Sequence, residues 1–195
     1  MNMNTNSYKI LILGDTHIPD RATRIPNKVI EWIENNKPYD MVIHTGDLTE
    51  EEVLEYLRNL TCSVIVVQGN MDYINLPEYE IIEIAQIKIG IIHGDQVYPR
   101  GNVRKLSRIA RKLRVNVLIS GHTHAPFIVV DSGILHLNPG SLTGVPSGSG
   151  GSLIPSFIIF RLKADGTAEV SLFELLRDRI VLSRHEFFKL TPITA

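Results

Sequence analysis

Short apolar runs alternate with stretches of helical spacing over the first two thirds of the chain. The runs cover residues 9–13, 40–44, 63–68, 88–93 and 116–120, and they are rich in Ile and Val. Such runs predict strands that are buried on both faces. Between them, one-sided apolar patterns predict helices over residues 26–35, from Thr49 to about Leu60, and over 102–113. Thr49 and Glu52 have the spacing of a capping box at the start of the second helix. This alternation predicts parallel strands with right-handed crossovers.

The last third of the chain has the pattern of antiparallel strands. Residues 127–130 with 134–137, and 156–162 with 168–175, flank turn residues and predict two hairpins. Residues 179–183 predict one more strand, and the Gly/Ser-rich segment 144–151 predicts a mobile loop. Since no linker divides the sequence, we expect a single domain over residues 1–195, flexible over 1–7. We expect a parallel α/β half to be completed by an antiparallel half.

Polar residues follow every one of the five apolar runs. The runs lead into Gly-Asp-Thr-His at 14–17, Gly-Asp at 46–47, Gly-Asn-Met-Asp at 69–72, His-Gly at 93–94 and Gly-His-Thr-His at 121–124. Because the carboxyl ends of parallel strands meet at one sheet edge, we expect these side chains to converge. The i, i+2 spacing within two motifs would place both donors on one side of an extended segment and direct them to a single ion. The candidate ligands are Asp15, His17, Asp47, Asn70, His93, His122 and His124.

This donor set points to a pair of metal ions. Seven N and O donors without a thiolate are too many for one tetrahedral zinc, and they suit two ions such as Mn, Ni, Fe, Co or Zn. A carboxylate bridging ions ~3.5–4 Å apart would position a hydroxide for in-line attack on phosphorus. A single Asp or His at a strand end is usually structural, but coincidence at five strand ends favours metal binding. His44, His136 and His185 lack such neighbours and are interpreted as structural.

With these motifs, the chain resembles the calcineurin-like metallophosphoesterases over about residues 9–141. Within this family, the chain resembles the small prokaryotic phosphodiesterase subgroup in its length, its GDTHIP segment and its Asn-Pro-Gly-Ser at 138–141. That subgroup is similar in fold to the retromer subunit Vps twenty-nine. The resemblance implies a four-layer α/β/β/α sandwich of two mixed β-sheets flanked by helices. It also implies a catalytic centre around Asp47 and Asn70. The implied ligands are Asp15, His17, Asp47 and His124 for one ion, and Asp47, Asn70, His93 and His122 for the other, with Asp47 bridging.

Met71 departs from the pattern of many family members, which have a histidine at this position. That histidine contacts the phosphate and can protonate the leaving group, a contribution of about 10²–10⁴-fold in rate. Methionine cannot donate a proton, so we expect a limited diesterase that favours good leaving groups. Asp72, which orients that histidine in other members, is expected to serve the turn alone.

The composition bears on the compartment and the partners of the protein, not on its activity. The chain carries 20 Lys+Arg against 21 Asp+Glu, is 44% hydrophobic, and has one cysteine, Cys62. We expect a cytoplasmic protein without a membrane segment, with Cys62 in the core. Basic residues over 100–114 leave nucleic acid open as a partner, but a solvated helix face is favoured. Apolar positions in the late strands leave a homo-oligomer open.

Two functional hypotheses follow. The favoured one is a dinuclear metal-dependent phosphodiesterase that acts on small or nucleotide-like phosphodiesters. The alternative is a protein–protein scaffold on the same fold, with a weak or vestigial metal site. Met71 and the retromer resemblance motivate the alternative, whereas the full set of expected ligands favours the enzyme.

Overall fold

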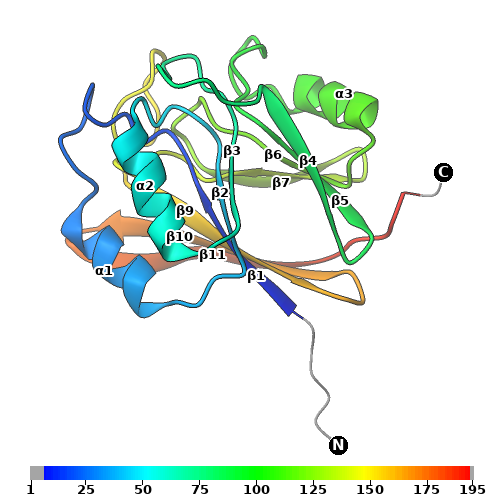
Figure 1. The fold of residues 1–195 in the computed structure, drawn as a ribbon. Coiled ribbons are helices and arrows are strands. Elements are labelled where there is room, and N and C mark those ends of the chain that lie inside the picture. The colour runs from blue at the N-terminus through cyan, green and yellow to red at the C-terminus, as the bar shows by residue number, and fades with distance from the viewer. Residues whose placement is uncertain (1–6, 194–195) are drawn as a thin grey trace, which may run out of the picture.

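The computed structural model describes residues 7–193 as two mixed β-sheets with three helices (Figure 1). The first sheet has the order β11-β10-β9-β1-β2-β3 and the second the order β4-β5-β6-β8-β7. The strands of the first sheet are β1 (Ser7–Leu13), β2 (Met41–His44), β3 (Val64–Val66), β9 (Ser156–Lys163), β10 (Thr167–Leu176) and β11 (Arg179–Lys189). Those of the second are β4 (Tyr79–Ile84), β5 (Ile87–Ile92), β6 (Val117–Ile119), β7 (Phe127–Asp131) and β8 (Ile134–Asn138). The helices are α1 (Asn27–Asn35), α2 (Glu51–Leu60) and α3 (Val103–Leu113).

The elements stack as the expected four-layer α/β/β/α sandwich. Along β1, Ile10 and Ile12 enter the core between the two sheets, while Leu11 and Leu13 enter a second core beneath α1 and α2. A third core joins the other sheet to α3, which lies on the opposite side of the molecule in Figure 1. Because both faces of the central strands are covered, these strands read as continuous apolar runs in the sequence.

The parallel strands are divided between the two sheets. β1, β2 and β3 are parallel in the first sheet, and β5, β6 and β8 are parallel in the second. Antiparallel strands extend both sets: β9 to β11 in the first sheet, β4 and β7 in the second. The expected completion of a parallel half by an antiparallel half is found in the first sheet, where β9 returns from the far end of the sequence to pair with β1. The difference from the expectation is that the second sheet contains both kinds of strand as well.

The remaining sequence predictions differ from the structure in a few places. The capping box at Thr49 is wrong: α2 follows Glu50 without a side-chain cap, and the Thr49 hydroxyl donates to the Ile18 carbonyl. β4 was not predicted, because it is a half-exposed edge strand whose turn into β5 uses Ala85 and Gln86. β11 extends well beyond the predicted 179–183.

Three expectations concern the chain ends and exposure. Cys62 is exposed rather than in the core. Of the segment 1–7 expected to be flexible, Ser7 is the first residue of β1, and residues 1–6 lie outside the described residues. Within the described part of the chain, no helix has the length and apolar character needed to cross a bilayer.

Candidate metal centre

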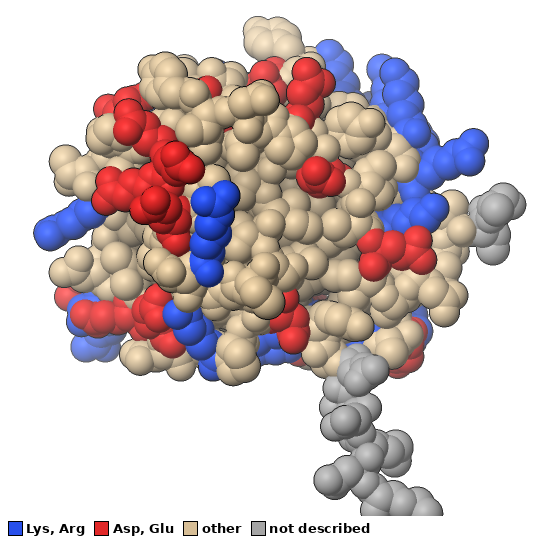
Figure 2. Space-filling model, viewed as in Figure 1, with Lys and Arg blue, Asp and Glu red and all other residues tan. Residues whose placement is uncertain are grey.

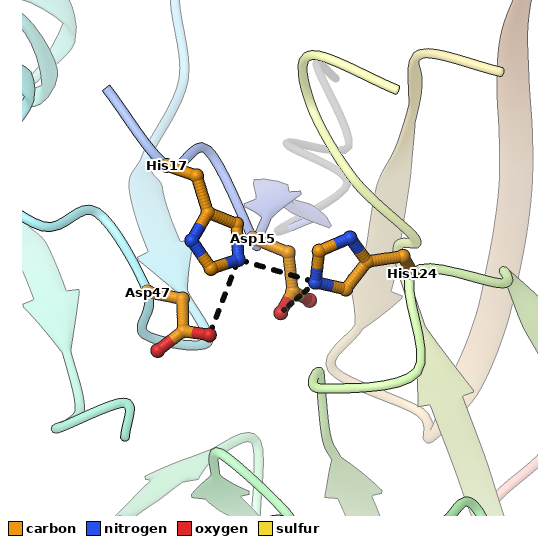
Figure 3. A group of neighbouring side chains, drawn as sticks. All are labelled: Asp15, His17, Asp47 and His124. Atoms are coloured by element: carbon orange, nitrogen blue, oxygen red, sulfur yellow. Dashed lines mark hydrogen bonds and ion pairs between the residues drawn. The ribbon is translucent and has the colours of Figure 1, made fainter. Parts of the chain in front are cut away.

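The candidate ligands come together where β1, β2, β3, β5 and β6 end. Figure 3 shows the first cluster, in which the side chains of four buried residues point toward one another. The second cluster joins three buried residues and shares Asp47 with the first. The first cluster is Asp15, His17, Asp47 and His124, and the second is Asp47, His93 and His122.

Short contacts connect the donor atoms of the first cluster (Figure 3). His17 Nε2 lies 3.2 Å from Asp47 Oδ2 and 3.2 Å from His124 Nε2. His124 Nε2 in turn lies 3.3 Å from Asp15 Oδ1. Four N and O atoms from three segments of the chain thus face one small volume.

The second cluster is centred on His93. Its Nε2 atom lies 3.5 Å from Asp47 Oδ2, 3.1 Å from His122 Nδ1 and 3.1 Å from Asn70 Oδ1. Asn70 is exposed, whereas His93 and His122 are buried. The structure therefore brings together all seven candidate residues, with Asn70 at the solvent side of the second cluster.

Two backbone carbonyls fix the orientation of the imidazole rings. His93 Nδ1 lies 2.8 Å from the Thr45 carbonyl, and His124 Nδ1 lies 2.7 Å from the Val145 carbonyl. Because a carbonyl can only accept, each Nδ1 carries the proton and each Nε2 presents its lone pair to the cluster. This is the arrangement that orients histidine ligands around metal ions. The chemistry of the donor set therefore fits a cation, and the two clusters are consistent with a dinuclear metal site.

The backbone at the clusters is left-handed, not extended. The φ angle lies between 47° and 66° at five of the seven residues, namely Asp15, His17, Asp47, His122 and His124. The expectation that the i, i+2 pairs lie on extended segments is therefore wrong. The two histidines of the second pair also belong to different clusters, so they do not converge on one ion. Asp and His tolerate this conformation better than most residues, but it is uncommon for any side chain.

The loop after β3 is packed directly against Asp47. A Cβ atom at Gly69 would overlap the backbone N and the Oδ1 of Asp47, so glycine is required at this close approach. The backbone N–H of Met71 donates to Asp47 Oδ1 at 2.8 Å. The Asp72 carboxylate accepts from the N–H groups of Asp47 at 2.9 Å, Gly69 at 2.7 Å and Thr49 at 2.8 Å. Asp72 therefore organises the turn that carries Asp47, as expected.

Burial and neighbouring charges act in opposite directions on the titratable groups. Burial would raise the pKa of Asp47, but the interactions with His17, His93 and the Met71 N–H outweigh it and hold the pKa well below its usual range. Burial lowers the pKa of His122 to about 4, and the neighbouring His93 and Arg100 contribute in the same direction. These shifts keep Asp47 anionic and His122 neutral at pH 7, which are the states that bind cations.

The remaining histidines have structural contacts. Buried His44 bonds to the Thr16 hydroxyl at 2.8 Å, and buried His136 bonds to the Ser107 hydroxyl at 2.8 Å. His185 lies 2.8 Å from the Ser171 hydroxyl across β10 and β11. None of the three belongs to either cluster.

Comparison with known proteins agrees with this geometry. Residues 8–165 match the family model of the calcineurin-like phosphoesterase superfamily domain. The chain belongs to this superfamily. It is 52% identical over 132 residues to a probable metallophosphoesterase of Methanocaldococcus jannaschii, covering 68% of this chain and 67% of that protein. It is 43% identical over 135 residues to a probable metallophosphoesterase of Methanothermobacter thermautotrophicus, covering 68% and 76%.

Solved structures of Vps29 share the fold. Vps29 from Cryptosporidium parvum superposes with a TM-score of 0.88 at 30% identity, over 94% of this chain and 98% of that one. Vps29 from Entamoeba histolytica, solved in complex with zinc, gives a TM-score of 0.83 at 34% identity, over 92% and 98%. The calcineurin-like chain is therefore a probable metallophosphoesterase with a buried His/Asp cluster for metal.

Proposed function

We propose that this protein is a phosphodiesterase that hydrolyses small or nucleotide-like phosphodiesters with two divalent metal ions. The observation that carries the proposal is the position of Asp47, whose carboxylate is shared by both clusters. One carboxylate between two groups of N and O donors is the arrangement of two-metal phosphoryl-transfer sites.

The proposed ligands divide between the two clusters. One ion would be held by Asp15, His17, Asp47 and His124, and the other by Asp47, Asn70, His93 and His122. The donor set accepts Mn, Ni, Fe, Co or Zn, and the zinc complex of Entamoeba histolytica Vps29 supports zinc among them. When bound, such ions supply an activated water and neutralise charge on the phosphoryl oxygens.

The protein's own groups supply positioning. Asp47 is held on both sides, since its Oδ1 accepts from the Met71 N–H while its Oδ2 faces His17 and His93. Exposed Asn70 places its side-chain amide at the edge of the second cluster, where it would act as a ligand and contact the phosphate. Met71 cannot protonate the leaving group, so the proposed enzyme favours esters of acidic alcohols or phenols.

Hydrolysis of bis-p-nitrophenyl phosphate tests the proposal. Metal-stripped protein would be resupplied with each divalent ion in turn, beside the Asp47→Ala variant and the control Asp95→Ala, which removes an exposed carboxylate outside both clusters. We expect metal-dependent turnover in the native protein and in the control. In Asp47→Ala, we expect turnover to be lost and the retention of metal to be weakened. Full activity of Asp47→Ala would refute the assignment.

The similarity to Vps29 supports a second candidate function, a protein–protein scaffold on the same fold. In that case no ion would restore turnover, and an inactive, metal-independent protein would bind a stable protein partner. The bis-p-nitrophenyl phosphate assay therefore separates the two candidates.

A further inference from the structure

A groove of about 410 Å³ is lined in part by the segment that carries the cluster residues His122 and His124. Three segments line it, represented by Arg100 before α3, Thr123 between the two histidines of its motif, and Gly151 at the end of the Gly/Ser-rich loop. Its volume is within the range of small-molecule sites. The groove is not part of either cluster, so its role is separate from metal binding.

Close backbone contacts join the groove to the clusters. A Cβ atom at Gly101 would lie 2.8 Å from Thr123 Cγ2, and a Cβ atom at Gly151 would lie 2.8 Å from His124 Cβ. Neither position has room for a side chain, so both segments are packed onto residues 122–124. The wall of the groove is therefore continuous with the segment that carries the candidate ligands His122 and His124.

Arg100 is the charged residue of the groove. Its Nη1 atom donates to the His122 carbonyl at 3.3 Å, which places the guanidinium against the backbone of a cluster residue. Within residues 7–193 no carboxylate pairs with Arg100, in contrast to Arg161 and Arg184, each of which pairs with a glutamate. Because a guanidinium has five N–H donors, most of them remain available to an anion in the groove.

The rest of the lining favours a compact organic group beside that anion. Phe127 and Pro126 supply apolar surface. The Thr123 hydroxyl is already engaged, since it donates to the Ala125 carbonyl at 2.9 Å and accepts from Asn138 Nδ2 at 3.1 Å. The groove thus combines the charge of Arg100, which suits a phosphate, with an apolar surface, which suits the sugar and base of a nucleotide.

The distribution of charge on the surrounding surface also favours an anionic ligand. In Figure 2, Asp and Glu gather on the side of α2, whereas Lys and Arg gather near α3. α3 begins three residues after Arg100 and carries exposed Arg104 and Lys105 in its first turn. In contrast, α2 has Glu51 and Glu52 in its first turn. The potential therefore favours approach of an anionic substrate from the side of the groove.

We propose that Arg100 is a specificity-determining residue that binds a second phosphate group, next to the phosphodiester held at the metal centre. The substrate class is then a nucleotide-type diester that carries an additional phosphate on its non-leaving side. This inference rests on the proposed phosphodiesterase function.

A pair of substrates that share one leaving group tests the role of Arg100. Thymidine 3′-(p-nitrophenyl phosphate) would be compared with its 5′-phosphorylated form, with bis-p-nitrophenyl phosphate as the reference. The variants are Arg100→Met and the control Arg108→Met, which removes the same charge from an exposed position on α3. In Arg100→Met, we expect KM for the 5′-phosphorylated substrate to rise about tenfold or more, with little change for the other two. Arg108→Met should resemble the native protein.

Two results separate failure of this inference from failure of the proposed function. If bis-p-nitrophenyl phosphate is hydrolysed but Arg100→Met affects all three substrates equally, Arg100 has only a structural role at His122 and the inference is wrong. If no substrate is hydrolysed, the proposed function fails, and calorimetric binding of thymidine 3′,5′-bisphosphate decides the role of Arg100. Binding that is equal in the native protein and in Arg100→Met would then overturn it.

Discussion

Replacing Asp72 with Asn should weaken both the fold and the metal site, although Asp72 belongs to neither cluster. Its carboxylate accepts three backbone N–H groups: those of Asp47 and Gly69 at Oδ2, and that of Thr49 at Oδ1. Asn has one acceptor oxygen. If that oxygen takes the place of Oδ2, the amide NH₂ group faces the Thr49 N–H, donor against donor.

The expected cost follows from the bonds that change. A hydrogen bond to a charged group contributes about 1.5–3 kcal/mol to stability, and Asp72→Asn removes one such bond. The two that remain lose the charge of their acceptor, which roughly halves their strength. Because Asp72 is only half-buried, the lower end of this range applies to each bond, and the total is about 3 kcal/mol. For a chain of this size it corresponds to a decrease in melting temperature of roughly 6–12 °C.

Chemical denaturation and calorimetric titration with Mn²⁺ or Zn²⁺ would measure the two effects. We expect Asp72→Asn to lower the free energy of unfolding and to weaken metal binding, because the displaced turn carries the shared ligand Asp47. Asp40→Asn is the control, since Asp40 accepts one backbone N–H, from Lys9 at the start of β1, remote from the clusters. A change below about 0.5 kcal/mol in Asp72→Asn, with unchanged metal affinity, would refute the reasoning, because surface substitutions reach that size.

Three further predictions concern single positions. Gly69→Ala should abolish metal binding in calorimetric titration, because the new Cβ overlaps Asp47. The control Gly133→Ala, which has open space but a φ of 75°, should lose about 1 kcal/mol of stability and retain the metal. Equal metal affinities of the two variants would contradict this prediction. Burial lowers the pKa of His136 from 6.5 to about 4, so the unfolded chain takes up the proton first, and the free energy of unfolding should fall by about 3 kcal/mol as the pH decreases from 6.5 to 4. In His136→Gln, the free energy of unfolding should depend less on pH between 6.5 and 4. The same pH dependence in the native protein and the variant would show that His136 is not the group responsible. Met71→His should raise turnover of phenyl relative to p-nitrophenyl diesters by up to about 10²–10⁴-fold, and an unchanged ratio at full metal content would count against an acid at this position.

The strands and the convergence of the ligands could be predicted because both depend on local sequence. A central strand that is buried on both faces leaves a continuous apolar run, as Ile10 to Leu13 does in β1. The candidate ligands follow such runs within a few residues, so the end of each strand determines where they lie. Asp47 could be expected near His93 without knowledge of which sheet carries either one.

Other features left no signal in the side chains. The carbonyls of Thr45 and Val145, which fix two imidazole rings, are backbone groups that every residue has. Val145 lies in a segment whose composition indicates only a mobile loop. The division of the parallel strands between two sheets depends on which strands pair, and long-range pairings such as that of β1 with β9 are not encoded in local patterns.

The backbone conformation at the clusters explains why an incorrect local argument still predicted the correct assembly. An extended segment would direct His122 and His124 to the same side, but their φ angles of 66° and 53° direct them into different clusters. Left-handed backbone costs a non-glycine residue roughly 1–2 kcal/mol, so it persists only where the surrounding structure imposes it. Here the Asp15 N–H bonds to the Gly46 carbonyl at 3.1 Å and the His17 N–H to the Asp47 carbonyl at 2.9 Å, which ties the loop after β1 to the loop after β2. The sheets beneath thus hold strained loops in place at the point where the donors must converge.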